Sequence, residues 1–281
     1  MIKILWLTCK KILNDVLSLY SKTEASAKFE RTEVITSRPP QVLVTKDARS
    51  MGEEAAERFI KVVKEYPDAT IILPTGSTPL PMYDAIVRRF GDDSMIDFSR
   101  VKFFNLDEYV GLPEDHPLSY HFYIRKVFYE RLNAIDSKRA PKPGNIYIPP
   151  CVAKGYNEEV TLKEAEEKAR EYERKLRQAI KATGRRKADL VVLGAGGAYP
   201  VYDKAGNFID IKGGHIGFNE PGSKRKCTTR VVKLTEKTRF DTKHLFDNLK
   251  HREDLEREYA TEVPEYAITL GIANILKSKE I

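Results

Sequence analysis

The sequence predicts an α/β fold: a doubly wound, mostly parallel sheet with helices on both faces. Short apolar segments such as 70–73 and 189–194 have the length and composition of buried strands. Longer segments between them repeat apolar residues at the three- and four-residue spacing of a helix. Strands that alternate with helices form covered parallel sheets, and such sheets bind ligands at the carboxyl ends of their strands.

The elements begin after Pro39 and Pro40, which mark a boundary because proline can neither continue a helix nor donate to a sheet. Strands and helices alternate up to residue 132, and a proline-rich connection, 140–150, then leads into one long helix. The expected strands cover 42–44, 70–73, 101–104, 189–194, 230–234 and 267–270, and the expected helices cover 51–66, 79–90, 119–132, 165–180 and 272–276.

The long helix carries its charges as pairs in which a glutamate precedes a cation by four residues. Glu164 precedes Lys168 and Glu171 precedes Lys175 in this way. Such pairs stabilise an exposed helix. This face is therefore expected to be a solvated surface, and its charge needs no ligand.

Composition excludes several classes of partner. The 281 residues include 48 Lys and Arg against 41 Asp and Glu, a net charge of +7 that is spread over short clusters, so we expect no nucleic-acid partner. No apolar run reaches the roughly 18 residues that cross a bilayer, so we expect no membrane segment. The three cysteines, Cys9, Cys151 and Cys227, are far apart and lack metal-ligand spacing. We therefore expect no metal, no disulfide and a cytoplasmic location.

The first candidate site lies between the strand 70–73 and the helix that follows it. Gly76 permits a ligand to approach the backbone, and Thr75, Ser77 and Thr78 supply hydroxyls. The start of the next helix favours an anion such as a phosphate. An ordinary capping turn explains the same residues equally well, and the loop lacks the spacing of a nucleotide-binding motif.

The second candidate is a pair of adjacent carboxylates, Asp107 and Glu108, which follow the strand 101–104. A carboxylate placed there can act as a general base. Neighbouring residues of a strand point to opposite sides, so only one of the two is expected to face a cleft. Taken alone, a helix cap or a loop ion pair is the favoured interpretation.

The third candidate is the glycine-rich segment 213–223, which holds His215 and, five residues later, Glu220. Histidine titrates near neutral pH and can transfer protons. A nearby glutamate can orient the imidazole or share the proton transfer.

Together these segments resemble the glucosamine-6-phosphate deaminase (glucosamine-6-phosphate isomerase) family. The resemblance is carried by 74–79 (PTGSTP), 105–109 (NLDEY) and 214–223 (GHIGFNEPGS), in this order. It runs from about Pro40 to the C-terminus and includes 263–271 (VPEYAITLG). The related 6-phosphogluconolactonases share the fold and the phosphate loop, but their third segment ends without FNEP.

The resemblance implies a Rossmann-like fold and an enzyme that uses no nucleotide, metal or other cofactor. The implied reaction deaminates and isomerises glucosamine 6-phosphate to fructose 6-phosphate and ammonia. His215, assisted by Glu220, would open the sugar ring, and Asp107 would enolise the open chain by moving the C2 proton to C1. The phosphate and hydroxyls of the substrate would be bound by Thr75, Gly76, Ser77 and Thr78.

The resemblance also divides the chain. Residues 1–38 are expected to form an N-terminal arm outside it, and 39–281 the deaminase/isomerase-like α/β domain. Within that domain residues 198–212 are expected to form an inserted hairpin, and the chain stops at Ile281, short of the family's usual C-terminus. Gly213 stands where the usual motif has an aspartate, two residues before the histidine.

Two other functions remain open. One is a protein that binds a sugar phosphate without converting it, which Gly213 and the short C-terminus favour. The other is a related sugar-phosphate hydrolase or isomerase, such as a 6-phosphogluconolactonase. The partner is a small sugar phosphate in every case, and because family members commonly form homo-oligomers, we expect a homo-oligomer.

Overall fold

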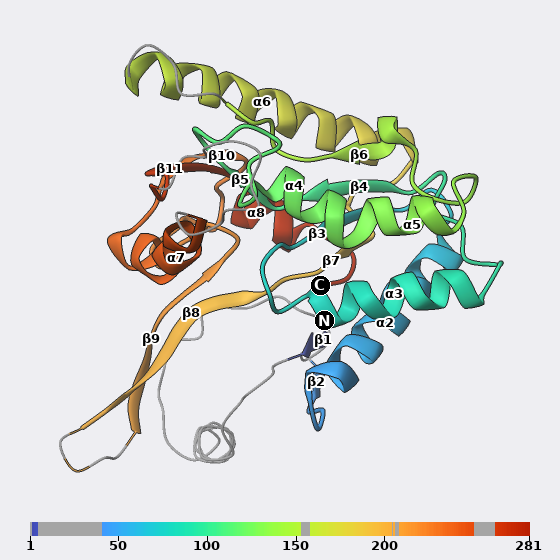
Figure 1. Ribbon diagram of the computed structural model, residues 1–281, viewed down its shortest axis with the longest axis horizontal. Coiled ribbons are helices and arrows are strands. Elements are labelled where there is room, and N and C mark those ends of the chain that lie inside the picture. The colour runs from blue at the N-terminus through green and yellow to red at the C-terminus, as the bar shows by residue number, and fades with distance from the viewer. Residues whose placement is uncertain (1, 5–40, 153–157, 204, 206–207, 250–261) are drawn as a thin grey trace.

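The computed structural model describes residues 2–4, 41–152, 158–203, 205, 208–249 and 262–281 (Figure 1). Its strands are β1 (Ile2–Ile4), β2 (Gln41–Leu43), β3 (Thr70–Leu73), β4 (Lys102–Asn105), β5 (Asp107–Tyr109), β6 (Ile146–Tyr147), β7 (Leu190–Val191), β8 (Ala195–Tyr202), β9 (Phe208–Ile216), β10 (Arg230–Lys233) and β11 (Tyr266–Thr269). Its α-helices are α2 (Ala48–Glu65), α3 (Leu80–Asp92), α4 (Tyr120–Ile124), α5 (Glu130–Ile135), α6 (Glu158–Ala182), α7 (Glu236–Leu249) and α8 (Ile272–Leu276). A π-helical turn, η1 (Arg125–Tyr129), joins α4 to α5, and a 3-10 turn, η2 (Pro143–Asn145), precedes β6.

A four-stranded parallel sheet with helices on both faces confirms the predicted fold class. Its strand order is β6-β4-β3-β7. Side chains alternate along the strands, so Ile71 and Phe103 pack under α2, α3 and η1, whereas Ile72 and Phe104 pack under α6 and α8. Figure 1 shows α6 on one side of the sheet and α2 with α3 on the other.

The helices α2 and α3 approach each other closely at Gly52. A Cβ atom on this residue would lie 2.4 Å from the carbonyl carbon of Pro81, in the first turn of α3. Glycine is therefore required here for close packing. The contact fixes the start of α3, which directly follows the loop 74–79.

A second, antiparallel sheet has the order β10-β11-β5. Its strands β10 and β11 were expected from the sequence, although as members of the parallel sheet. Leu106 joins it to the parallel sheet, because its N–H donates to Leu73 O at 3.0 Å and its carbonyl accepts from Leu270 N at 2.8 Å. The chain thus passes from one sheet to the other at a single residue.

The strands β8 and β9 form a long antiparallel hairpin that reaches away from the two sheets (Figure 1). They cover 195–202 and 208–216, which is longer than the hairpin expected at 198–212. At the base of the hairpin Gly196 pairs with His215. Most of the expected N-terminal arm, 1–38, lies outside the described residues, but Ile2–Ile4 pairs in parallel with β2. Among the described helices, none is long and apolar enough to cross a membrane.

Candidate active site

A cavity of about 230 Å³ lies at the carboxyl ends of β3 and β4, where a parallel sheet is expected to bind a ligand. Residues from all three candidate segments line it, as do Tyr120 and Phe218. The sequence-predicted residues that line it are Thr75, Gly76, Ser77, Thr78, Asp107 and His215. Glu220 is not among the lining residues but lies behind His215.

The loop 74–79 forms one wall of the cavity. Gly76 has a φ of +91°, a left-handed conformation that glycine adopts without strain. Two tyrosines brace the loop, because the hydroxyl of Tyr83 donates to Pro74 O at 2.6 Å and that of Tyr123 donates to Gly76 O. The positive end of the α3 dipole follows directly, which favours an anionic group in this part of the cavity.

Asp107 lies in β5 and is 4% exposed. Thr75 Oγ1 lies 3.4 Å from its Oδ1 and donates to it. Burial and the neighbouring charge of Glu108 raise the pKa of Asp107 to about 8, although Thr75 and the N–H of Phe218 oppose the shift. A carboxyl group with such a pKa can both accept and return a proton near neutral pH.

Glu108 points to the other side of β5, so the expectation that only one of the two carboxylates faces the cleft is confirmed. Its Oε1 accepts from Tyr109 N at 2.8 Å and Tyr120 N at 3.1 Å. Its Oε2 accepts from His121 N at 2.9 Å and Ser119 Oγ at 2.8 Å. Glu108 therefore holds the start of α4 against β5.

His215 is the penultimate residue of β9, and its Nδ1 lies 3.9 Å from Glu220 Oε2. Glu220 is itself oriented by two threonines at the start of α7, since Thr235 Oγ1 donates to its Oε1 at 3.2 Å and Thr238 Oγ1 donates to the same oxygen. The structure thus brings the predicted histidine and glutamate together. Gly213 lies within β9, opposite Ala198.

The loop after β9 is tied to β11. Phe218 N donates to Thr269 Oγ1 at 3.2 Å, and Asn219 Nδ2 donates to Leu270 O at 2.7 Å. Thr269 pairs with Asp107 across the antiparallel sheet. The antiparallel sheet therefore fixes Asp107 and the histidine loop relative to each other.

Sequence reasoning missed Tyr120 and Phe218 as lining residues. Their rings stack with centroids 5.9 Å apart, and both contact the ring of Tyr109. Tyr109 and Phe218 lie inside the recognised motifs, and this was the only signal for them in the sequence. Their placement depends on the meeting of three chain segments, which no local pattern encodes.

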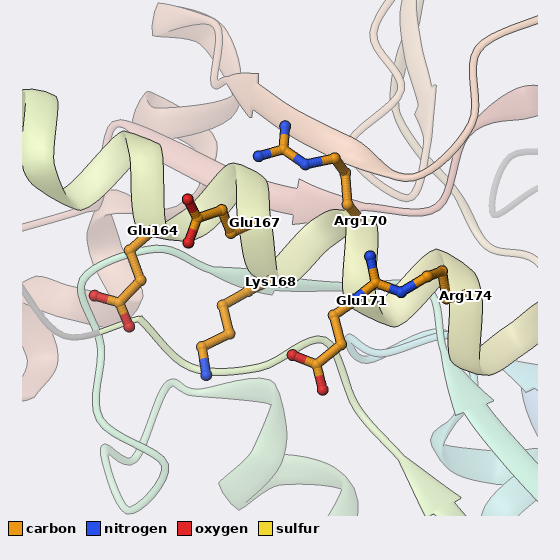
Figure 2. A pocket seen from close by; sticks show the side chains of 6 residues that line it. All are labelled: Glu164, Glu167, Lys168, Arg170, Glu171 and Arg174. Atoms are coloured by element: carbon orange, nitrogen blue, oxygen red, sulfur yellow. The ribbon is translucent and has the colours of Figure 1, made fainter.

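Two further cavities lie elsewhere. Figure 2 shows a hollow on α6 that is lined by six charged side chains of that helix alone. Four of them, Glu164, Lys168, Arg170 and Glu171, belong to glutamate–cation pairs spaced four residues apart, which stabilise an exposed helix. A cavity of about 330 Å³ lies between α6 and α8, and several of its basic side chains are already paired, such as Arg185 with Asp68 and Arg177 with Glu173.

A family described as glucosamine-6-phosphate isomerases/6-phosphogluconolactonase matches residues 45–198. A glucosamine-6-phosphate deaminase of Thermoanaerobacter sp. (strain X514) is 36% identical over 241 residues, which are 86% of this chain and 76% of the relative. The glucosamine-6-phosphate deaminase of Bifidobacterium longum (strain NCC 2705) is 34% identical over 248 residues, 86% of this chain and 75% of the relative.

Two solved structures extend the comparison. A monomeric glucosamine-6-phosphate deaminase superposes with a TM-score of 0.56 at 29% identity, over 84% of this chain and 77% of the other. A 6-phosphogluconolactonase from Trypanosoma cruzi reaches the same TM-score of 0.56 at 16% identity, over 88% and 80% of the two chains. At that identity the second likeness concerns the fold alone.

Proposed function

This chain belongs to the glucosamine-6-phosphate deaminase family, and on that premise we propose that it converts glucosamine 6-phosphate and water to fructose 6-phosphate and ammonia. One observation carries the proposal. A single cavity of about 230 Å³ brings together the loop Thr75–Thr78, the buried carboxyl of Asp107 and the imidazole of His215. These are an anion-binding loop and two proton-transfer groups, which is the set that the reaction requires.

The proposed reaction uses each group in turn. The phosphate of the substrate binds at the Thr75–Thr78 loop, near the start of α3. His215, oriented by Glu220, transfers the proton that opens the pyranose ring. Asp107 then removes the proton from C2 and delivers it to C1, and water hydrolyses the resulting ketose imine to release ammonia.

Burial of Asp107 supports its role as the base. A fully exposed aspartate is too weak a base to abstract a proton from carbon at neutral pH, whereas burial raises the pKa of Asp107 to about 8. The contact from Thr75 and the pairing of β5 with β11 keep the carboxyl in place. Each proton transfer is thereby confined to a preformed site.

We also propose that residues 39–281 act as one catalytic domain, with the 198–212 region as an insertion that carries His215 at its base. The proposed partner is a small sugar phosphate. That the chain forms a homo-oligomer stays a prediction, made because family members commonly do so. One similar solved structure is of a monomeric deaminase, so sedimentation of the purified protein decides between the two states.

The experiment measures ammonia and fructose 6-phosphate released from glucosamine 6-phosphate by the purified chain, each with its own coupled enzyme. Asp107→Asn is expected to lower kcat by about 10²–10⁴-fold, because proton transfer by one positioned group contributes that much. Asp84→Asn is the matched control, since Asp84 is a 63%-exposed carboxylate in an ion pair with Arg131, and it should leave kcat unchanged.

Absence of ammonia release by the folded chain, or full activity of the Asp107→Asn variant, would contradict the proposal. Calorimetric binding of the sugar phosphate without turnover would support a binding protein instead. Hydrolysis of 6-phosphogluconolactone by the purified chain, measured in the same way, would support the related hydrolase.

A further inference from the structure

Three side chains that can bind a metal meet behind β5, on the side away from the cavity. They are Glu108 of β5, His121 in the first turn of α4, and Cys151 in the segment that follows β6. Their ligand atoms all lie within 4.8 Å of one another. The Cys151 sulfur and Glu108 Oε2 are 3.8 Å apart. Figure 1 shows α4 beside β5.

The imidazole of His121 is oriented so that one nitrogen remains available to a cation. Its Nε2 lies 3.0 Å from the carbonyl oxygen of Pro149. A carbonyl can only accept, so Nε2 carries a hydrogen, and in the neutral ring Nδ1 then carries the lone pair. Metal-bound histidines show this arrangement, in which the second ring nitrogen donates to a backbone carbonyl.

A fourth donor stands on the open side of the cluster. Glu114 Oε1 lies 3.8 Å from His121 Nδ1, and the Glu114 side chain is 64% exposed. Glu108, by contrast, is fully buried. Glu108 therefore closes the buried side of the cluster. Glu114 lies on the side that faces solvent, from which a cation can enter.

We propose that Glu108, His121 and Cys151 bind a divalent cation of the zinc class, with Glu114 as the fourth ligand. A thiolate, an imidazole and carboxylates suit zinc, whereas Mg²⁺ and Ca²⁺ prefer oxygen ligands alone. Bonds of about 2.0–2.2 Å to nitrogen and oxygen and about 2.3 Å to sulfur, in tetrahedral geometry, place neighbouring donors roughly 3.3–3.6 Å apart. The separation of Cys151 Sγ from Glu108 Oε2 and that of His121 Nδ1 from Glu114 Oε1 are each 3.8 Å, close to that spacing.

The backbone holds the ligands in place before any cation binds. Val152 pairs with Val110, and Gly111 N donates to Val152 O at 2.8 Å, which fixes Cys151 beside β5. The first turn of α4, which carries His121, is held by the Ser119 side chain that caps it. Small rotations of side chains are therefore sufficient to bring the donors to bonding distance.

Cation binding releases the proton of the Cys151 thiol and any proton on Glu108, and it breaks the hydrogen bond from Ser119 to Glu108. The thiol of Cys151 loses its proton to solvent as sulfur bonds to the cation. The hydroxyl of Ser119 donates to Glu108 Oε2 in the absence of a cation. When the cation takes that lone pair, the hydroxyl hydrogen turns away from Oε2, while Ser119 Oγ still accepts from His121 N. Any proton on Glu108 is likewise released.

The bound cation would link β5, α4 and the segment that follows β6. The first residue of α4 is Tyr120, which lines the candidate active site. The cation would thus support the wall of the cavity without touching the substrate. Glu108, His121 and Cys151 do not line the cavity, so a cation can bind there whether or not the chain performs the proposed reaction.

The experiment uses the full chain, tag-free and stripped of metal, titrated with Co²⁺ and followed by absorption. We expect one Co²⁺ per chain with a thiolate-to-cobalt charge-transfer band, and displacement of the cobalt by Zn²⁺. Cys151→Ser should abolish the band, and His121→Gln should weaken binding at least about tenfold. Cys227→Ser is the matched control, since Cys227 is also a free, partly exposed thiol, and it should keep both the band and the affinity.

Failure of the folded wild-type chain to bind Co²⁺ would overturn the proposal. Retention of the band in Cys151→Ser, or its loss in Cys227→Ser, would do the same. Circular dichroism of the metal-free variants tests their folding. If Cys151→Ser does not fold, the wild-type stoichiometry and the His121→Gln affinity decide the question.

Discussion

Replacing Gly52 by alanine tests how the α2–α3 contact supports the proposed phosphate loop. A Cβ at this position would lie 2.4 Å from the carbonyl carbon of Pro81 and 2.6 Å from its Cβ. Carbon atoms in contact normally lie about 3.5–4.0 Å apart, so the two helices would have to separate by about 1 Å. The clash involves backbone atoms, which cannot rotate aside as a flexible side chain would.

Two opposing effects set the magnitude. Alanine is a better helix former than glycine by about 0.5–1 kcal/mol. Overpacking a tight contact costs about 1–3 kcal/mol or more. The second effect is larger because the displaced atoms belong to a helix backbone, so we expect Gly52→Ala to lower the free energy of unfolding by about 1–2 kcal/mol.

Gly91→Ala is the matched control, because Gly91 also lies in a helix, α3. A Cβ there would meet only the Ile135 side chain, at 3.8 Å, an ordinary contact. This variant should therefore gain about 0.5–1 kcal/mol, the opposite sign. Urea unfolding of both variants, with unchanged slopes, measures the two shifts.

The displaced residue, Pro81, lies three residues after Thr78 of the proposed phosphate loop. Gly52→Ala should therefore also raise KM for the sugar phosphate more than it lowers kcat, whereas Gly91→Ala should change neither. If Gly52→Ala is as stable as the wild type, or as stabilising as Gly91→Ala, the steric argument is wrong.

Two further predictions concern stability. Burial opposes ionisation of Glu173, but hydrogen bonds from Thr229, Arg177 and Asn274 hold its pKa below the usual 4.5. The stabilisation is thus complete above pH 4.5 and lost as the pH falls through the lowered value, so Glu173→Gln should cost about 1–3 kcal/mol at pH 7 and progressively less in acid. Urea midpoints across this pH range measure the difference, and a difference independent of pH would contradict the assignment. Arg139→Lys should cost about 1–3 kcal/mol, because the guanidinium donates to three backbone carbonyls at the end of α3 and an ammonium cannot match that fork. A variant that unfolds within about 0.5 kcal/mol of the wild type would refute this.

Elements with a strong local pattern were predictable. The strand at 70–73 and the short helix at 272–276 have the expected bounds. The π-helical turn within the expected helix 119–132 was not predictable, because nothing in its apolar spacing distinguishes it from an α-helix. The antiparallel pairing of β10 and β11 was also missed, since a strand's partner and direction depend on distant parts of the chain.

In the candidate site, too, local motifs were predictable and contacts between distant segments were not. Its motifs were recognisable in the sequence, and the structure brings their residues to one cavity. The cluster of Glu108, His121 and Cys151 escaped notice because its members come from three separate segments. Sequence reasoning looks for metal ligands at short spacings, and these three converge only through the fold.

The junction at Leu106 has a mechanical consequence. Its two backbone hydrogen bonds, one to Leu73 at the end of β3 and one to Leu270 directly after β11, tie the parallel sheet to the antiparallel sheet. Enzymes built from two lobes often close around a substrate by a hinge. In this chain a hinge between the sheets would break the hydrogen bonds of Leu106, the residue directly before Asp107. Entry and release of a substrate must therefore depend on movements of the loops around the cavity.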